Sequence, residues 1–144
     1  MLVNRCKLSK KSVKAMTLIE LLFVVALIGL LALFAYPNYQ QQIRAAHRTT
    51  AISDLTKLQL EIEHGYNQGY HWEGLISNGK CLICRSEPEH FVFEIQASTN
   101  SPYVIKAIAQ EQSQQTLDSC LIANNANYLS LDANNREFPS GCWQ

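Results

Sequence analysis

The pattern of apolar and polar positions begins with a long apolar run. Residues 16–36 form a stretch of 21 residues that holds one charged side chain, Glu20. A helix of that length spans about 30 Å, the thickness of the hydrocarbon core of a bilayer. The run therefore predicts a transmembrane helix. Glu20 lies just inside it, where an ionised side chain without a partner costs about 2 to 3 kcal/mol or more.

The pattern after the run predicts that the helix continues. Pro37 falls where the apolar run ends, and a proline inside a helix removes one hydrogen bond and bends it. We interpret Pro37 as a kink in a helix that goes on over residues 37–66, because glycine is absent until Gly65. Apolar residues recur at steps of three and four, which predicts an amphipathic half packed against a sheet. These residues are Ala51, Leu55, Leu58, Ile62 and Tyr66.

Several side chains of this half lie off the apolar stripe. Leu60 is either a contact between subunits or an exposed residue without a role. Arg44 and Arg48 lie one turn apart in a glutamine-rich stretch, and we interpret them as part of a solvated helix face. His47 and His64 are predicted to be surface residues.

Alternating residues farther along the chain predict an antiparallel hairpin. The two runs on either side of the polar turn 98–102 alternate between apolar and polar residues, as strands do. In a register whose paired numbers sum to 200, Phe93 lies opposite Ala107 and Glu94 lies opposite Lys106. Apolar partners and opposite charges then agree, which favours this register.

Residues 67–144 are predicted to form one small globular head. Residues 67–90 are polar and glycine-rich, which is typical of a long connecting loop. The sheet is expected to cover residues 91–132. It should include brief pairing over 117–122 and a last strand over 128–131 that turns its two leucines, Leu129 and Leu131, inward.

Charge and cysteine content bound the location and the partners. The first 15 residues hold five cations and no acid, so the positive-inside rule keeps the N-terminus cytoplasmic. The rest of the chain, residues 16–144, holds the other seven Lys and Arg against twelve Asp and Glu, a net charge of about minus five. That charge disfavours a DNA-binding surface but leaves a local basic patch open. Cys6 lies in the first 15 residues. The rest of the chain has an even number of cysteines, which predicts two disulfides with three possible connectivities. They are Cys81, Cys84, Cys120 and Cys142.

The N-terminal residues resemble those of type IV prepilins. A basic leader and a small residue precede Met16-Thr17-Leu18-Ile19-Glu20 and an unbroken apolar helix. In that family a dedicated peptidase cleaves before the apolar run, here after Ala15, and methylates the new amine, here on Met16. Ala15 and Met16 stand where the family usually has Gly and Phe. The resemblance implies that residues 1–15 are a cleaved leader and that residues 16–36 form the transmembrane and fibre-core helix.

The resemblance also explains Glu20. After cleavage, the protonated amine of Met16 would lie in an apolar bundle of helices. A carboxylate on one subunit and an ammonium on its neighbour neutralise each other, and removing one partner of such a buried pair costs about 3 to 5 kcal/mol. We therefore expect Glu20 to set the register between packed subunits. The alternative is a plain signal anchor with a stray polar residue.

The fold implied by the resemblance is the α+β type IV pilin fold. A long N-terminal helix, with a transmembrane half and an amphipathic half, packs on a small antiparallel sheet, and a disulfide bounds the C-terminal region. A Cys120–Cys142 bond would close a ring of about 23 residues, worth about 3 kcal/mol, and would hold the irregular tail as a C-terminal loop, 120–142. The ending Cys142-Trp143-Gln144 most resembles PilE-like minor pilins of the type IVa pilus.

Cys81 and Cys84 allow three interpretations. They form a structural disulfide, a redox-active dithiol, or half of a zinc site completed by His71 or His90. We favour the structural bond. A redox dithiol is expected at a helix N-terminus, and a zinc site would need a second close pair of ligands.

The resemblance implies a structural subunit of a type IV pilus, most simply a minor pilin that primes assembly or sits at the tip. It would support pilus biogenesis, twitching motility, adhesion or DNA uptake. Its partners would be other pilin subunits, the prepilin peptidase and the inner-membrane assembly platform. It would lie in the inner membrane before assembly and in the extracellular fibre afterwards.

Other functions remain open from the sequence. A type II secretion pseudopilin shares the N-terminus, and a competence pilin would bind DNA. A membrane-anchored periplasmic thiol or zinc protein is the alternative outside fibres. The sequence shows no constellation of catalytic residues, so we expect neither an enzyme nor a cofactor or metal.

Overall fold

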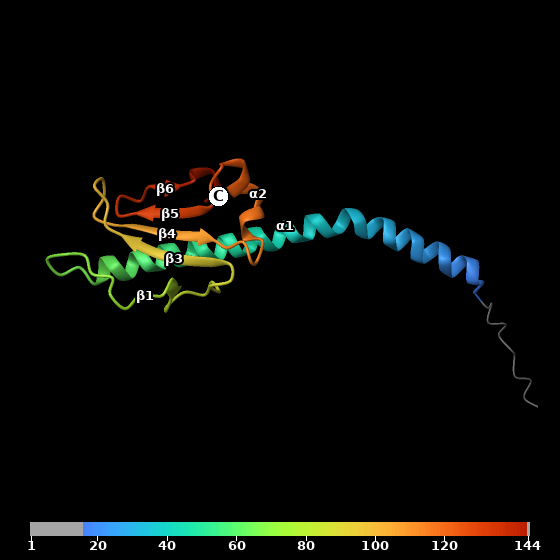
Figure 1. The fold of residues 1–144 in the computed structure, drawn as a ribbon, viewed down its shortest axis with the longest axis horizontal. Helices are drawn as coiled ribbons and strands as arrows, with labels where there is room; N and C mark the ends of the chain where they lie inside the picture. Colours follow the sequence, from blue (N-terminus) through green and yellow to red (C-terminus); the bar gives the residue numbers. More distant parts are fainter. Residues whose placement is uncertain (1–15, 144) are drawn as a thin grey trace, which may run out of the picture. The chain divides into compact units, whose positions relative to one another are not determined.

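A computed structural model describes residues 16–143 (Figure 1). The chain divides into two compact units, residues 1–37 and 38–144. The helices are α1 (Leu18–His64), η1 (Gln115–Leu117), α2 (Ser119–Ala123) and η2 (Ser140–Cys142). The strands are β1 (Ile76–Ser77), β2 (Lys80–Cys81), β3 (Phe91–Gln96), β4 (Val104–Ala109), β5 (Tyr128–Asp132) and β6 (Glu137–Phe138). The α+β fold expected of a type IV pilin is confirmed.

Helix α1 runs without interruption through Pro37, as predicted. Every residue from 16 to 39 is exposed. Among the described residues, α1 is the one helix long and apolar enough to cross a membrane, judged by length and composition alone. The Oγ1 of Thr17 accepts a hydrogen bond from the Glu20 backbone N–H at 3.4 Å, which satisfies one donor in the first turn.

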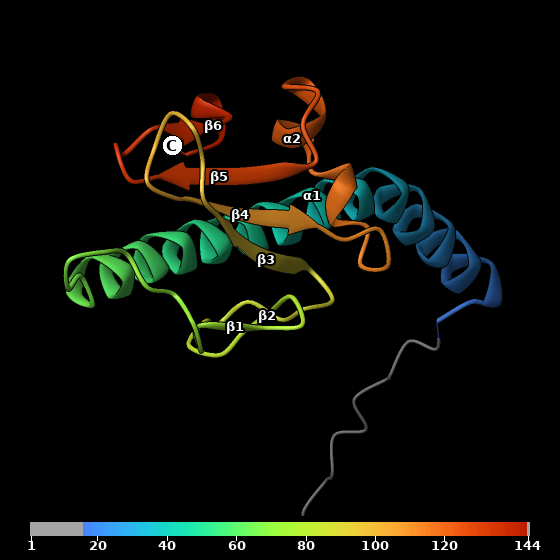
Figure 2. The ribbon, with the colours of Figure 1, turned by 60° about the vertical axis from the view of Figure 1, so that its left-hand side comes forward.

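The second half of α1 packs against one face of the main sheet, as Figures 1 and 2 show. Its buried stripe is the predicted one, namely Ala51, Leu55, Leu58 and Ile62. Tyr66, which we expected to end the stripe, follows the helix and is exposed. Leu60 lies off the stripe and is 67% exposed. The stripe and the sheet together form the hydrophobic core of the head.

The main sheet has the strand order β3-β4-β5-β6, with antiparallel neighbours. Its first pair has the predicted register, because Phe93 lies opposite Ala107 and Glu94 lies opposite Lys106. Strand β5 also agrees with the prediction, with Leu129 and Leu131 buried. The sheet extends beyond residue 132, since the tail adds β6 before it turns into η2.

Residues 117–122 were expected to pair as a strand, and this prediction is wrong. They form the end of η1 and most of α2. The side chain of Asp118 caps α2 by accepting hydrogen bonds from the N–H groups of Cys120 and Leu121. An Asp at the N-cap satisfies donors that a helix end leaves open, and so it favours a helical turn here.

The connecting loop contains a small hairpin that was not predicted from the sequence. Strands β1 and β2 are joined by Asn78 and Gly79, whose φ angles are 51° and 76°. A two-residue Asn-Gly turn with both φ angles positive matches the twist of antiparallel strands. The hairpin lies beside β3 (Figure 2).

Candidate functional site

Two of the predicted assembly residues lie at the start of the described chain. Met16 comes just before α1 and Glu20 lies in its first turn, and both are exposed. Ala15 and the rest of the leader, residues 1–15, lie outside the described residues. Cleavage after Ala15, methylation of Met16 and the register role of Glu20 therefore stay predictions.

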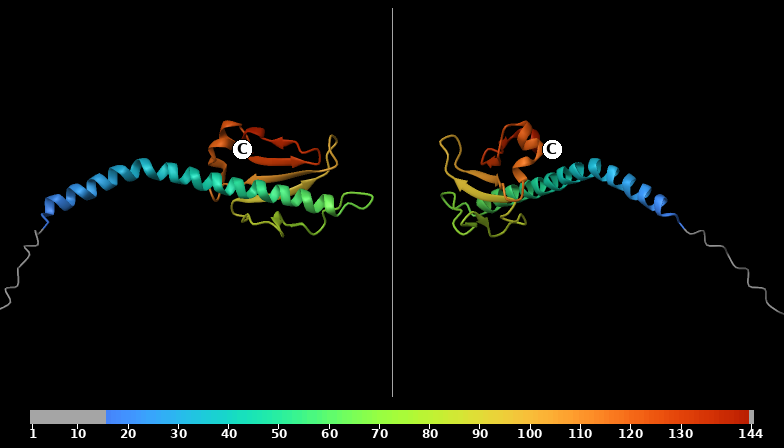
Figure 3. Two further views of the ribbon diagram at one scale, coloured as in Figure 1. Left: turned by 180° about the vertical axis from the view of Figure 1, so that it is seen from behind. Right: turned by 45° about the vertical axis from the view of Figure 1, so that its right-hand side comes forward.

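A disulfide joins Cys120 in α2 to Cys142 in η2, with 5.7 Å between their Cα atoms. It links segments that Figure 3 shows close together, near the C-terminal end of the chain. The side-chain amide of Asn124 donates to the Cys120 carbonyl at 2.9 Å. The bond thus fixes the short helix α2 to the tail, as the expected C-terminal loop requires.

A second disulfide joins Cys81 and Cys84, with 5.4 Å between their Cα atoms. Buried Asp54 holds the chain just after it, because its carboxylate accepts hydrogen bonds from the N–H groups of Arg85 and Ser86 at 2.8 to 3.1 Å. Lys57, one turn along α1, donates to the Ile83 carbonyl at 2.6 Å. The loop is therefore fastened to the helix at two points, which agrees with a structural bond.

The zinc alternative for this loop gains no support. Both sulfurs are engaged in the bond between Cys81 and Cys84. His90 stacks on His47, and His71 lies 3.9 Å from the Glu73 carboxylate. Over residues 16–143, no group of three or more His, Cys, Asp or Glu side chains gathers in a way that could hold a metal ion.

The two arginines of α1 were interpreted as a solvated face, and this interpretation is wrong. Arg44 is 9% exposed and donates to the Gln114 side chain at 3.0 Å. The side chain of Gln115 returns a hydrogen bond to the Arg44 carbonyl at 2.9 Å. Arg48 forms an ion pair with Asp118, whose side chain is 1% exposed. These interactions fasten η1 and α2 to the helix across about 70 residues of sequence.

The two histidines of α1 differ in their surroundings. His64 is exposed, as predicted. His47 is half-buried, with its ring stacked on that of His90 at 3.7 Å between centroids. Burial lowers the pKa of His47 and the neighbouring His90 lowers it further, while Glu87 acts in the opposite direction.

A buried tyrosine ties the end of α1 to the sheet. Tyr103 is fully buried and donates its hydroxyl hydrogen to the Glu63 carboxylate. Burial raises the pKa of Tyr103 far above its usual value, and the hydrogen bond to Glu63 raises it further. The hydroxyl therefore stays protonated and keeps donating at neutral pH.

Three exposed cations gather around the Cys81–Cys84 loop. Lys57 reaches it from α1, Lys80 directly precedes Cys81, and Arg85 directly follows Cys84. We call these three residues the loop cations. Two other basic side chains are ion-paired with acids, namely Arg48 and Arg136. The loop cations are thus a local positive group in a part of the chain, residues 16–144, where seven Lys and Arg stand against twelve Asp and Glu.

Two protein-family models match the chain, one after the other along its length. The model described as "Type IV minor pilin ComP, DNA uptake sequence receptor" matches residues 37–124, more than half of the 144 residues. The model described as "Prokaryotic N-terminal methylation motif" matches residues 10–36.

Curated relatives agree with this result. Two proteins described as "Fimbrial protein", both from Pseudomonas aeruginosa, are each 41% identical to this chain over 85 residues. The aligned part is 59% of this chain and 49% of each relative, so the chain spans about half the length of the curated relatives it matches. No solved structure gives a significant match.

Proposed function

The chain belongs to the type IV minor pilin family, and from this premise we propose that it is a pilus subunit whose head binds DNA during DNA uptake. The observation that carries the proposal is the match of residues 37–124 to the family described as a DNA uptake sequence receptor. The match covers most of residues 37–144, the part of the chain that follows the apolar run. Pilin families are structural, which agrees with the prediction that the chain is not an enzyme.

The loop cations offer a place where DNA phosphates can bind. Protein–DNA affinity depends mainly on Lys and Arg side chains that neutralise phosphates. Lys57, Lys80 and Arg85 are exposed and surround one loop. The loop is itself fixed by a disulfide and by Asp54, so the cations are held on a rigid base. The acidic net charge, which disfavoured DNA binding, does not remove this local group.

The test is the affinity of the full chain, in neutral detergent micelles, for labelled duplex DNA. Fluorescence anisotropy at several salt concentrations should give an affinity that falls as salt rises. Replacing all three loop cations by Gln should weaken binding. The slope of the logarithm of the binding constant against the logarithm of the salt concentration should become shallower by about 0.9 for each phosphate that is no longer neutralised. Lys106→Gln is the matched control, because it removes one cation from the main sheet and not from the Cys81–Cys84 loop. Lys106 lies on β4, with its amine 5.4 Å from the centroid of the Tyr128 ring. Unchanged binding by the triple variant would exclude this site.

The N-terminal residues 10–36 support a second part of the proposal, which concerns processing and assembly. We propose that the prepilin peptidase cleaves after Ala15 and methylates Met16, and that Glu20 then pairs with the amine of a neighbouring subunit. The N-methylation motif over residues 10–36 supports this processing. The subunit would pass through the inner-membrane assembly platform and join other pilins in the fibre, where it would prime assembly or sit at the tip.

Mass spectrometry of sheared fibres tests this second part. We expect a low-abundance chain that begins with methylated Met16. A chain that keeps residues 1–15 in cells would contradict the assignment, because the amine that balances Glu20 would then not exist.

A further inference from the structure

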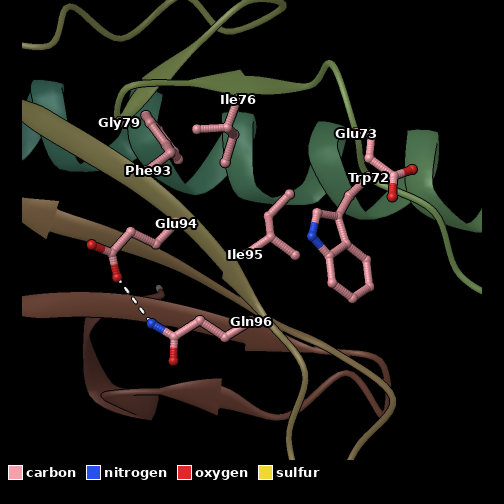
Figure 4. Close-up of a pocket in the computed structure, with 8 residues that line it drawn as sticks. All are labelled: Trp72, Glu73, Ile76, Gly79, Phe93, Glu94, Ile95 and Gln96. Carbon is pink, nitrogen blue, oxygen red and sulfur yellow. Dashed lines mark hydrogen bonds between the residues drawn. The ribbon is translucent and has the colours of Figure 1, made fainter.

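A groove of about 510 Å³ lies between β3 and the chain that follows α1 (Figure 4). This volume falls within the usual range for ligand sites, about 300 to 1,000 Å³. We call it the β3-edge groove. It is lined by Trp72, Glu73, Ile76, Gly79, Phe93, Glu94, Ile95 and Gln96.

The backbone of β3 is open along this groove. Phe93 donates its N–H to the Gly79 carbonyl at 2.9 Å, on the side away from β4. Gln110 donates its N–H to the His90 carbonyl, so these two residues form a hydrogen-bonded pair just before β3. Because such pairs alternate along an antiparallel ladder, the backbone N–H and C=O groups of the even-numbered residues of β3 point to β4. Ile95 therefore directs its N–H and C=O outward, like Phe93. Within residues 16–143, no group accepts the Ile95 N–H. An open strand edge of this kind pairs readily with an added strand.

The hairpin β1–β2 closes the other end of the edge. A Cβ on Gly79 would lie 2.5 Å from the Cγ1 of Val92, so only glycine allows the hairpin to approach β3 this closely. The φ of Gly79 is 76°, which also favours glycine. An added strand can therefore pair with the backbone of β3 only after Phe93.

The two sides of β3 present different chemistry in the groove. In Figure 4, Phe93 and Ile95 project to one side of the strand, and Glu94 and Gln96 project to the other. Trp72 and Ile76 add half-buried apolar surface.

The charged groups in the lining are all acidic. Glu73 and Glu94 are exposed, and Glu94 accepts a hydrogen bond from Gln96 at 3.0 Å. The residues that line the groove include no basic side chain. The charge of this site therefore complements a cation and repels a nucleic acid.

We propose that the β3-edge groove binds an extended segment of a partner protein in which apolar and basic residues alternate. The segment would pair with the backbone of Ile95 as an added strand. Its apolar side chains would pack on Trp72 and Ile95, and its Lys or Arg side chains would lie beside Glu94. Alternate residues of a strand point to opposite faces, which matches the two sides of β3. This inference does not depend on DNA binding, since the loop cations lie outside the lining.

Fluorescence of Trp72 can report binding to this groove. The chain has two tryptophans, so Trp143→Phe leaves Trp72 as the one reporter in the full chain in neutral detergent. A short peptide of alternating Val and Lys should shift its emission in a saturable way. The same peptide with Glu in place of Lys should give no shift. N-methylation of the peptide backbone on its pairing edge should weaken binding about fivefold or more, because each hydrogen bond that it removes contributes about 1 kcal/mol.

Matched variants show how much the charge of the groove contributes to the affinity for the Lys peptide, as distinct from the net charge of the whole chain. Glu94→Gln should weaken binding of the Lys peptide about two- to fivefold, and Gln96→Lys should weaken it about fivefold or more. Glu137→Gln is the control, because it removes an equal, exposed charge from β6 at the opposite edge of the sheet. Binding that is unaffected by both groove variants, or equal binding of the Glu or N-methylated peptide, would overturn the proposal.

Discussion

Residues 18–37 and 38–64 belong to one continuous helix, yet their side chains are buried to very different extents. Every side chain of the first half is exposed. The second half buries Leu55, Leu58 and Ile62 completely, in contact with the sheet. The first half is apolar on all sides, whereas the second gathers its buried apolar residues on one stripe. A helix that is apolar all round requires a surrounding apolar phase or other helices, and one with a stripe needs only a single partner face.

The two halves of the helix therefore depend on two kinds of partner. The second half finds its partner within the chain and so determines the stability of the head. The first half must find its partner outside the chain, in lipid or in other subunits. Substitutions in the first half should therefore change assembly, and substitutions in the second half should change folding.

The largest effect is expected for Glu20→Ala. The variant should insert into the membrane normally, because the apolar run becomes more apolar. Its incorporation into fibres should fall about a hundredfold or more, since the amine of a neighbouring subunit would lose the buried partner that we propose for it. Sheared fibres and membrane fractions would be quantified by immunoblotting. Glu61→Ala removes an exposed acid from the second half and should assemble normally. Normal incorporation of the Glu20 variant would refute the pairing role.

The second prediction concerns the stripe. Leu58→Ala should lower the free energy of unfolding of the head by about 3 to 4 kcal/mol, because it leaves a cavity at a fully buried position. Leu60→Ala is the matched control two residues away, and it should change the free energy by less than about 0.5 kcal/mol. Urea denaturation of both variants measures the difference. Equal effects would mean that the stripe is not what holds the helix to the sheet.

Sequence periodicity was sufficient for the parts of the head that are local or regular. The helical stripe follows from spacings of three and four residues, and the β3–β4 register follows from matching apolar and charged pairs such as Glu94 and Lys106. The N-terminal motif was likewise readable, because it is short and specific. These features depend on residues that are close in sequence or repeat regularly.

Interactions between distant residues were not predictable in the same way. Arg48 and Asp118 are separated by about 70 residues, and no periodic pattern connects them. The run around Leu121 and Ile122 is too short for periodicity to distinguish a strand from a helical turn. The Asn78-Gly79 turn, in contrast, carried a recognisable signal, and the hairpin could have been found from it. The β3-edge groove could be found only in three dimensions, because it lies between two segments that the sequence does not relate.

A smaller effect on folding is expected from the ion pair between the second half of α1 and α2. Arg48→Gln should lower the free energy of unfolding by about 2 to 3 kcal/mol, because the buried Asp118 carboxylate loses its counter-charge. The loss stays below the full cost of an unpaired charge, since Asp118 keeps the hydrogen bonds from Cys120 and Leu121. The double variant Arg48→Gln, Asp118→Asn should recover part of the loss. A double variant whose loss equals the sum of the two single losses would show that the two residues are not coupled.

The smallest effect is a dependence of head stability on pH that comes from His47. Burial and His90 hold its pKa in the folded head below the usual value of about 6.5, with Glu87 opposing them. The unfolded chain then binds more protons than the folded head below that pH, so the contribution of His47 to stability is lost as the pH falls from about 6.5. Thermal unfolding between pH 7 and pH 5 should show a decline that is smaller in His47→Gln. His64→Gln, at an exposed position of the same helix, should keep the full decline. An unchanged pH profile in the His47 variant would assign the decline to other groups.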